Sequence, residues 1–337
     1  MKRKTIYFTA PHQVEVREES LPALGADSVL VETICSAISA GTEMLVYRGQ
    51  FPQLKDSYDA LSSDLKYPLA YGYACVGVIK DTGPNVDKSL IDKLVFGFQP
   101  HTSAFITQPA SLIFAPASSS ETLSFSAETC SFIPNMETAV NLVQDAAPIL
   151  GERVLVLGQG VVGLLVACLL KEFPLEELVT SDCYELRRKA SLDSGIKRCF
   201  DPEDKSNSVY AQSKFDLTFE LSGSPSTLND AITLTAFSGR IIVGSWYGEK
   251  KAPVDLGGAF HRSRIKLISS QVSTIAPELS GRWNKARRFG VVWEALKRIQ
   301  PQKWITHRFP SEEAAQAYKL LDENPQETIQ VLFEYKS

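Results

Sequence analysis

The segment VLVLGQGVVG, residues 154–163, constrains the fold of this chain more than any other part of its sequence. β-Branched and apolar residues run into Gly158, Gly160 and Gly163, and a helical apolar run, VVGLLVACLLKEF, follows them. This order predicts a strand, a tight turn and a helix. Three glycines with this spacing in this setting indicate a turn that binds a dinucleotide.

Each glycine of this turn has its own expected role. Gly158 makes the turn, Gly160 lets the backbone approach a pyrophosphate, and Gly163 allows the helix to pack closely on the strand. The free N–H groups at the helix N-terminus then face the phosphates. The alternative is that the glycines only permit a tight turn and that no ligand binds. We expect the cofactor to contact the whole turn, which consists of Gly158, Gln159, Gly160, Val161, Val162 and Gly163.

Asp182 ends the next predicted strand, LEELVTSD. An acidic side chain at this place accepts hydrogen bonds from the adenine ribose 2′-hydroxyl and repels a 2′-phosphate, so NAD is favoured over NADP. NADP stays an alternative, because Ser181, Arg187 and Arg188 lie close enough in the sequence to accommodate a phosphate. The other role open to Asp182 is to cap the helix expected over YELRRKASLDSG.

Composition limits the class of protein. A chain of 337 residues can bury a large core and predicts two domains. A net charge of −4 gives no global attraction to nucleic acid or to anionic membranes, so we expect a small-molecule partner. The N-terminal segment lacks an apolar signal core, and no run reaches the roughly 18 apolar residues of a membrane span, which predicts a cytoplasmic protein. The six cysteines never pair as CxxC, which favours reduced, buried thiols.

The chain divides into two kinds of pattern. Residues 1 to roughly 120 contain short strands separated by turns, which predicts a β-rich region. From residue 126 onward strands and helices alternate, which predicts a parallel sheet with helices on both faces. A basic stretch at 282–298 carries apolar residues near helical spacing, so we expect an amphipathic helix with a solvated basic face rather than a nucleic-acid site.

Several motifs in this order resemble the medium-chain dehydrogenase/reductase superfamily: AISAGTEMLVYRG at 37–49, YPLAYGYACVGVI at 67–79, VLVLGQGVVG, and FELSGSP at 219–225. The AISAGTE segment, the PH at 100 and 101, and LGGAFHRSRIKLISSQVS at 256–273 are similar to the branch containing bacteriochlorophyllide a hydroxyethyl dehydrogenase. The resemblance implies an α/β protein. Its GroES-like β-rich catalytic domain would comprise residues 1–122 and 275–337, and its Rossmann domain, a doubly wound parallel sheet, residues 123–274. It also implies a homodimer formed through the Rossmann edge strand.

The chain departs from the family pattern where zinc members bind their metal. Those members read like CGTD where residues 40–43 of this chain are AGTE, so the thiolate ligand is missing. The family's GHE segment, which supplies an imidazole, is GYA at residues 72–74. Cys130 lies near the position of the family's third zinc ligand, but a catalytic zinc needs three protein ligands. The lobe of four cysteines that holds a structural zinc is absent as well. We therefore expect no zinc.

Without a metal, a side chain has to donate or accept a proton at the reacting oxygen. The resemblance places Thr42, Glu43, Tyr73 and His101 around the nicotinamide. Thr42 matches the family's relay hydroxyl, and its alternative is an ordinary turn cap. Tyr73 replaces the lost histidine and suits a donor better than a base, or else it only packs. His101 is either a proton shuttle or a surface histidine. Glu43 either orients Thr42 or pairs with Arg48.

The resemblance adds four residues to the expected cofactor site. Ser222 and Gly223 match the family turn that approaches the cofactor ribose, and Ser245 and Trp246 follow the next strand, along the nicotinamide half. The leading function is a zinc-independent oxidoreductase that transfers hydride between a nicotinamide dinucleotide and an alcohol/carbonyl substrate. The alternatives are a quinone or enoyl reductase acting on activated double bonds, and a non-catalytic dinucleotide-binding protein.

The segment 51–70 bears on the size of the substrate. Its apolar and aromatic residues suggest a wall for a large or aromatic substrate, or else a packed flap; they are Phe51, Tyr58, Leu61, Leu65 and Tyr67.

Overall fold

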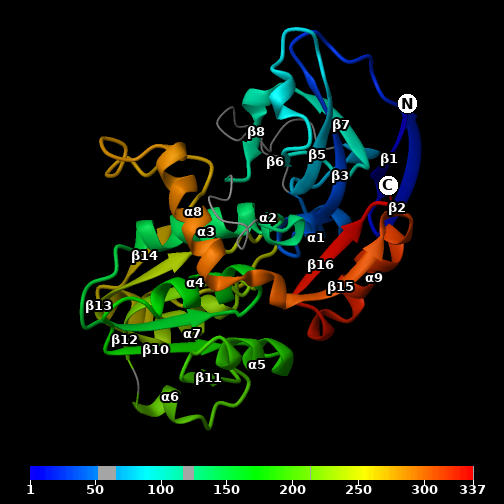
Figure 1. Ribbon diagram of the computed structural model, residues 1–337. Helices are drawn as coiled ribbons and strands as arrows, with labels where there is room; N and C mark the ends of the chain where they lie inside the picture. Colours follow the sequence, from blue (N-terminus) through cyan, green and yellow to red (C-terminus); the bar gives the residue numbers. More distant parts are fainter. Residues whose placement is uncertain (52–65, 117–124, 213, 337) are drawn as a thin grey trace. The chain divides into compact units, whose positions relative to one another are not determined.

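A computed structural model describes residues 1–51, 66–116, 125–212 and 214–336 (Figure 1). The chain forms two compact units. The first unit comprises Met1–Pro134 and Leu296–Ser337, so both ends of the sequence contribute to it. The second unit comprises Asn135–Ala295. Of the aromatic and apolar residues expected to form a wall at 51–70, Tyr58, Leu61 and Leu65 lie outside the described residues.

The first unit contains two sheets. One has three strands in the order β2-β1-β4, and the other has the order β15-β16-β3-β5-β6-β8, with β7 also paired to β3. The strands are β1 (Lys2–Ala10), β2 (Gln13–Ser20), β3 (Val29–Ala37), β4 (Leu69–Ala70), β5 (Cys75–Thr82), β6 (Leu94–Gly97), β7 (Ala104–Thr107), β8 (Leu112–Phe114), β15 (Ile305–Pro310) and β16 (Gln330–Glu334). The helices are α1 (Thr42–Tyr47), α2 (Ala127–Cys130) and α9 (Ala314–Glu323), with short 3₁₀ segments at Lys88–Leu90, Pro109–Ser111, Pro301–Trp304, Ser311–Glu313 and Pro325–Glu327.

The C-terminal segment completes the core of the first unit. Strand β16 pairs antiparallel with β3, and the Tyr318 ring of α9 packs edge-on against Phe8 of β1, with 4.9 Å between the ring centroids. The ring of Tyr47 in α1 stacks on the Tyr318 ring, with 5.6 Å between the ring centroids. Phe51 and Tyr67 also pack against this cluster. Residues separated by about 300 positions thus form one core, because neither segment alone could bury these aromatic surfaces.

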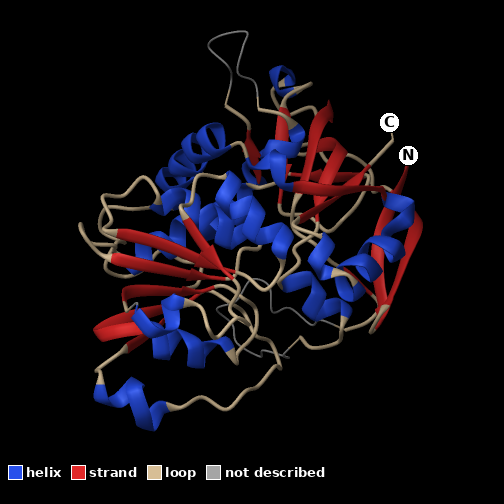
Figure 2. Ribbon diagram, turned by 90° about the horizontal axis from the view of Figure 1, so that it is seen from below, coloured by secondary structure: helices blue, strands red, loops and turns tan. Residues whose placement is uncertain are grey.

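The second unit is a parallel sheet of six strands in the order β11-β10-β9-β12-β13-β14. Helices flank both of its faces (Figure 2), which explains why Val154 to Leu157 of β9 are all buried. The strands are β9 (Arg153–Leu157), β10 (Glu177–Ser181), β11 (Arg198–Phe200), β12 (Phe215–Glu220), β13 (Thr235–Val243) and β14 (Lys266–Ser269). The helices are α3 (Ile133–Ala146), α4 (Val161–Leu170), α5 (Glu185–Asp193), α6 (Ser208–Gln212), α7 (Thr227–Leu234) and α8 (Lys285–Ile299), with a π-helical turn at Leu256–Phe260; α3 and α8 each cross a unit boundary.

The register aligns the carboxyl ends of four strands in one row. Leu157 of β9 lies opposite Ser181 of β10 on one side and Glu220 of β12 on the other, and Glu220 lies opposite Val243 of β13. The chain winds outward from β9 through β10 to β11 and then returns to place β12 on the other side of β9. The order therefore reverses between β9 and β12, which is where ligands bind in open parallel sheets.

Helix α8 is amphipathic, but one of its basic residues is not solvated. Val292 and Leu296 are fully buried, as the spacing predicts, whereas Arg288 is buried too. Its guanidinium lies 3.5 Å from the carboxylate of Glu137 and donates to the carbonyl oxygen of Val272. The expectation of a fully solvated basic face is wrong at this position, because a buried carboxylate and carbonyl groups replace its water.

Two further findings come from the described part of the chain. None of its helices combines the length and the apolar character needed to cross a membrane. All six cysteines are free thiols, and four of them are buried.

Candidate functional site

The glycine turn of the second unit is tight at two positions and open at the third. Gly158 has a φ of +93°, and a Cβ there would lie 2.5 Å from the carbonyl oxygen of Leu221. A Cβ on Gly163 would lie 1.9 Å from the carbonyl oxygen of Gly158. A Cβ on Gly160 would meet nothing within 4 Å. The fold itself therefore requires glycine at 158 and 163, whereas the absence of a side chain at 160 leaves space beside the backbone.

Helix α4 begins directly after this turn. Gly160 is its N-cap residue, and Val161 and Val162 form its first turn. The N–H groups of a first helical turn have no acceptor within the helix and carry the positive end of its dipole. The Gln159 side chain points inward, where its Nε2 donates to the carbonyl oxygen of Gly158 at 2.9 Å. This turn can therefore contact a ligand mainly through its backbone N–H groups.

Asp182 ties the glycine turn to the end of β10. Its Oδ2 accepts from the N–H of Gln159 at 2.7 Å, and its Oδ1 accepts from the N–H of Tyr184 at 2.8 Å. The N-cap of α5 is Tyr184, so the capping role considered for Asp182 is wrong. A carboxylate oxygen accepts more than one hydrogen bond, so this geometry leaves Asp182 capacity for a ribose hydroxyl.

The arginines after Asp182 are engaged within the second unit. Arg188 lies 2.9 Å from the carboxylate of Asp201 and donates to the carbonyl oxygen of Asp182. The guanidinium of Arg187 lies 4.8 Å from the centroid of the Tyr184 ring. A 2′-phosphate would have to compete with these contacts.

Glu220, at the carboxyl end of β12, organises the remaining residues expected at the cofactor, and sequence reasoning missed it. Its side chain is fully buried. Its Oε1 accepts from the N–H and the hydroxyl of Ser222, and its Oε2 accepts from the hydroxyl of Tyr247. The N–H of Gly223 in turn donates to the Ser245 hydroxyl at 2.9 Å. Trp246 is half-buried in the same loop as Ser245 and Tyr247.

In the first unit, Thr42 and Tyr73 meet at a residue that sequence reasoning also missed. The Tyr73 hydroxyl donates to the Ser39 hydroxyl oxygen at 2.5 Å, and the N–H of Thr42 lies 3.4 Å from the same oxygen. Burial raises the pKa of Tyr73 above its ordinary value, so the phenol is neutral near pH 7 and acts as a donor. All three side chains are partly accessible. The available signal was the polar Ser39 within the AISAGTE motif.

Glu43 and His101 form a buried pair behind these hydroxyls. His101 Nε2 lies 2.8 Å from Glu43 Oε2, and both side chains are fully buried. The same Oε2 accepts from the Tyr318 hydroxyl at 2.5 Å, and Oε1 accepts from the N–H of Ser39 at 2.9 Å. The surface alternative for His101 is therefore wrong, because its ring nitrogens are satisfied inside the protein. The expected pairing of Glu43 with Arg48 is also wrong.

Arg48 pairs elsewhere, and a glycine makes room for the imidazole. The guanidinium of Arg48 lies 2.6 Å from a carboxylate oxygen of Asp322. Gly72 has a φ of +111°, and a Cβ there would lie 2.5 Å from Cδ2 of His101. The glycine before Tyr73 thus allows the His101 ring to lie against the backbone.

Cys75 and Cys130 are buried thiols of the first unit. Burial raises the pKa of each to about 12. Within the described ranges, no group of three or more His, Cys, Asp or Glu side chains is arranged to hold a metal ion. Ala40 and Tyr73 occupy the positions at which zinc members of the resembled family carry a cysteine and a histidine.

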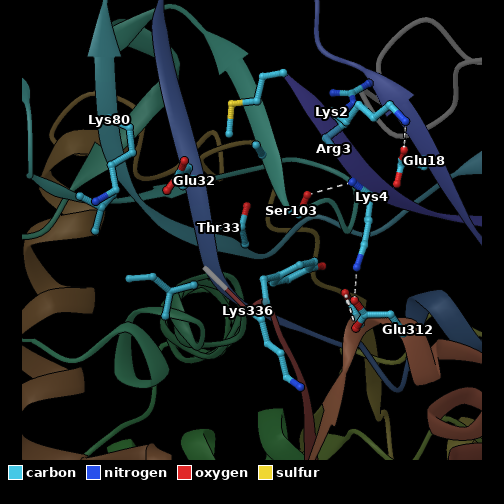
Figure 3. Close-up of a pocket in the computed structure, with 16 residues that line it drawn as sticks. Lys2, Arg3, Lys4, Glu18, Glu32, Thr33, Lys80, Ser103, Glu312 and Lys336 are labelled. Carbon is cyan, nitrogen blue, oxygen red and sulfur yellow. Dashed lines mark hydrogen bonds and ion pairs between the residues drawn. The ribbon is translucent and has the colours of Figure 1, made fainter.

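A separate surface cavity of about 470 Å³ lies at the outer side of the first unit (Figure 3). Basic side chains line it, but Lys2 pairs with Glu18 and Lys4 pairs with Glu312. These ion pairs neutralise much of the positive charge that would attract an anion. The cavity has no side chain in common with the residues expected to be catalytic.

The comparisons with known proteins agree with this fold. No protein-family model matches the chain. It is 22% identical to the starvation-sensing protein RspB of Escherichia coli strain K12, over 98% of this chain and 99% of that protein. It is 23% identical to the 2-desacetyl-2-hydroxyethyl bacteriochlorophyllide A dehydrogenase of Cereibacter sphaeroides, over 96% of each. Among solved structures it is similar to a short chain alcohol dehydrogenase (rspB) of E. coli CFT073 complexed with NADH, with a TM-score of 0.76, 19% identity and 99% of each chain covered.

These relatives and neighbours are alcohol dehydrogenase-like members of the medium-chain dehydrogenase/reductase superfamily. The fold class expected from the sequence, GroES-like plus Rossmann, is confirmed.

Proposed function

We propose that this protein is an NAD(P)-dependent oxidoreductase that interconverts an alcohol and a carbonyl compound, with NAD as the preferred cofactor. The observation that carries the proposal is the glycine turn, closed by backbone contacts at Gly158 and Gly163 and open at Gly160. The relatives with dehydrogenase names and the neighbour complexed with NADH support it. When bound, the dinucleotide supplies or accepts the hydride.

The two units divide the work in this proposal. The Rossmann domain, expected as residues 123–274, holds the dinucleotide, and the GroES-like domain, expected as 1–122 and 275–337, carries the proton-transfer groups. Asp182 favours NAD because a 2′-phosphate would meet its carboxylate. The engagement of Arg188 with Asp201 supports the same preference. A homodimer through an edge strand of the parallel sheet and membership of the bacteriochlorophyllide branch belong to this proposal as well.

Tyr73 and Ser39 carry the proton chemistry. During carbonyl reduction the oxygen gains a proton. The neutral Tyr73 phenol supplies it by turning its O–H from Ser39 Oγ to the substrate oxygen, and the phenolate left behind takes a proton back from water. Ser39 accepts a hydrogen bond from the Tyr73 hydroxyl before a substrate is present, and the Thr42 side chain lies within hydrogen-bonding reach of the same phenol. Glu43 and His101 act through Ser39 as positioning residues, because their own polar atoms are fully buried. This arrangement replaces the metal, so we propose a zinc-independent enzyme.

Energy transfer from the four tryptophans to bound nicotinamide tests the cofactor assignment. NADH and NADPH are titrated into purified protein whose zinc content has been measured. We expect NADH to bind more tightly than NADPH, with zinc far below one ion per chain. Failure to bind either dinucleotide would refute the proposal. Tighter NADPH binding would overturn the role of Asp182, and stoichiometric zinc would overturn the metal-free mechanism.

A substrate panel then separates the reactions. Alcohols, aldehydes and ketones of increasing size, large aromatic rings included, are compared with quinones and enones. We expect turnover of alcohol/carbonyl pairs. Turnover of quinones or enones alone would favour the reductase alternative, and cofactor binding without any turnover would favour the non-catalytic one.

A further inference from the structure

Glu220 occupies a special place in the row of strand ends. It is opposite Leu157 of β9, on the side away from Asp182, at the point where the strand order reverses. A dinucleotide lying across this point, with its adenosine over Asp182, extends its other half over Glu220 and β13. The glycine turn and the loop after β12 are close neighbours, because a Cβ on Gly158 would lie 2.7 Å from the Cα of Ser222.

The bonds of Glu220 join two separate loops. The carboxylate accepts from Ser222 in the loop after β12 and from Tyr247 in the loop after β13. The backbone carbonyl of Glu220 accepts from the N–H of Gly244 at 3.1 Å and from that of Ser245 at 3.3 Å. These loops are exposed or half-buried, whereas Glu220 is fully buried. One buried residue therefore fixes the positions of both loops.

The two loops are also bonded to each other. The N–H of Gly223 donates to the Ser245 hydroxyl, and Lys250 Nζ donates to the carbonyl oxygen of Gly223 at 2.9 Å. Neither bond involves the glycine turn or Asp182. Loss of the Glu220 carboxylate would thus loosen one half of the crevice and leave the adenosine half intact.

We propose that Glu220, through Ser222 and Tyr247, is the positioning residue for the nicotinamide half of the cofactor. This inference rests on the proposed function. Tyr247 contributes by holding the loop that carries Ser245 and Trp246, so that these residues are ordered before the cofactor arrives. Ordering the loop in advance removes an entropic cost that binding would otherwise bear.

The test compares two ligands by calorimetry. NADH contains both halves of the cofactor, whereas ADP contains only the adenosine and the pyrophosphate. Tyr247→Phe keeps the ring and removes only the hydroxyl, and Glu220→Gln keeps the shape and removes the charge. We expect each variant to weaken NADH binding about tenfold, which is the effect of losing one hydrogen bond to a charged group. ADP binding should weaken less than about twofold.

Matched controls come from the same unit. Glu177→Gln alters a carboxylate at the opposite end of the sheet, where it pairs with Arg153 and Arg198. Tyr210→Phe removes a hydroxyl bonded to Lys205 and to the Pro202 carbonyl oxygen. We expect both controls to bind NADH as the unaltered protein does.

Each result decides between the two proposals. Unchanged NADH binding in Tyr247→Phe and Glu220→Gln would overturn the role of Glu220 and leave the proposed function intact. Equal weakening of NADH and ADP would overturn it too, because the effect would then be a general loss of structure. If the unaltered protein bound neither ligand, both proposals would fail.

Discussion

A buried glutamate in each unit accepts a hydrogen bond from a tyrosine hydroxyl, but the two carboxylates differ in where their partners come from. Glu43 binds His101 and Tyr318, which lie 58 and 275 residues away in the sequence. Glu220 binds donors that lie only two and 27 residues away, in the loops after two neighbouring strands. The first carboxylate joins distant parts of one core, and the second joins two loops at a ligand-binding edge.

The origin of its hydrogen-bond partners determines what each carboxylate does. Partners drawn from the core cannot move without unpacking it, so Glu43 contributes mainly to the stability of the first unit. Partners drawn from loops can be lost while the sheet remains, so Glu220 contributes mainly to the shape of the crevice. Four substitutions test this contrast, and they follow in order of their expected effect on stability.

The largest effect is expected from Glu43→Ala. It leaves the buried polar groups of His101 and Tyr318 without their acceptor, and each unsatisfied buried group costs about 1–3 kcal/mol, so we expect a loss of roughly 3–5 kcal/mol in all. Glu220→Ala should cost less, about 1–3 kcal/mol, because Ser222 can turn to water. Urea denaturation of both variants measures the two free energies of unfolding. An equal or larger loss for Glu220→Ala would refute the contrast.

Gly72→Ala should have the next largest effect. At a φ of +111° a Cβ would lie 2.5 Å from the His101 ring, so the substitution adds a steric clash to backbone strain. We expect a loss of roughly 2–4 kcal/mol. Gly223→Ala is the matched control in the second unit, since its φ is +75° and a Cβ would meet nothing within 4 Å. It should lose only about 1–2 kcal/mol. Equal losses in thermal or urea unfolding would show that His101 does not press on residue 72.

Tyr318→Phe should change how stability depends on alkaline pH. Burial, and then the charge of Glu43, raise the pKa of Tyr318 well above its ordinary value. In the unfolded chain the same phenol ionises near pH 10, so the folded state holds one more proton above that pH. Stability is therefore full below pH 10 and falls above it by about 1.4 kcal/mol per pH unit.

Removing the Tyr318 hydroxyl should reduce that slope. Tyr247→Phe should reduce it as well, because burial and then the charge of Glu220 raise the pKa of Tyr247 well above its ordinary value. Unfolding free energies measured between pH 9 and pH 11.5 compare the variants, within the roughly two-unit range where the unfolded phenol ionises. An unchanged slope in Tyr318→Phe would show that its phenol ionises in the folded state.

The contrast between the two carboxylates also explains which parts of the site the sequence could predict. The glycine turn is local: strand, turn and helix follow one another, and the spacing of Gly158, Gly160 and Gly163 carries the backbone geometry. The parallel sheet and the fold class follow from the same alternation of patterns. Asp182 could be found because it ends the next predicted strand.

The remainder depends on packing between residues that are far apart in the sequence. Nothing around His101 indicates that its ring lies against Gly72, because that contact requires β5 and β7 to be placed first. Arg288 was predicted to be solvated for the same reason, because the sequence does not show that its partner Glu137 is buried beside it. A partial signal for Glu220 was present in the sequence, because an acidic residue within the apolar strand FDLTFE can be buried only if hydrogen-bond donors surround it.

Tyr73→Phe should have the smallest effect on stability, about 1 kcal/mol, because it removes a single hydrogen bond to Ser39. Its effect on chemistry should be large: we expect NADH binding to be unchanged and carbonyl reduction to slow by about 100-fold or more, the contribution of a positioned proton donor. Because burial raises the pKa of Tyr73, the unaltered protein should not lose reduction rate as the pH approaches 10. Tyr7→Phe, which removes a surface hydroxyl bonded to Glu19, is the control and should leave the rate unchanged. If Tyr73→Phe reduced the carbonyl as fast as this control, Tyr73 would only pack, and the proton would have to come from Thr42.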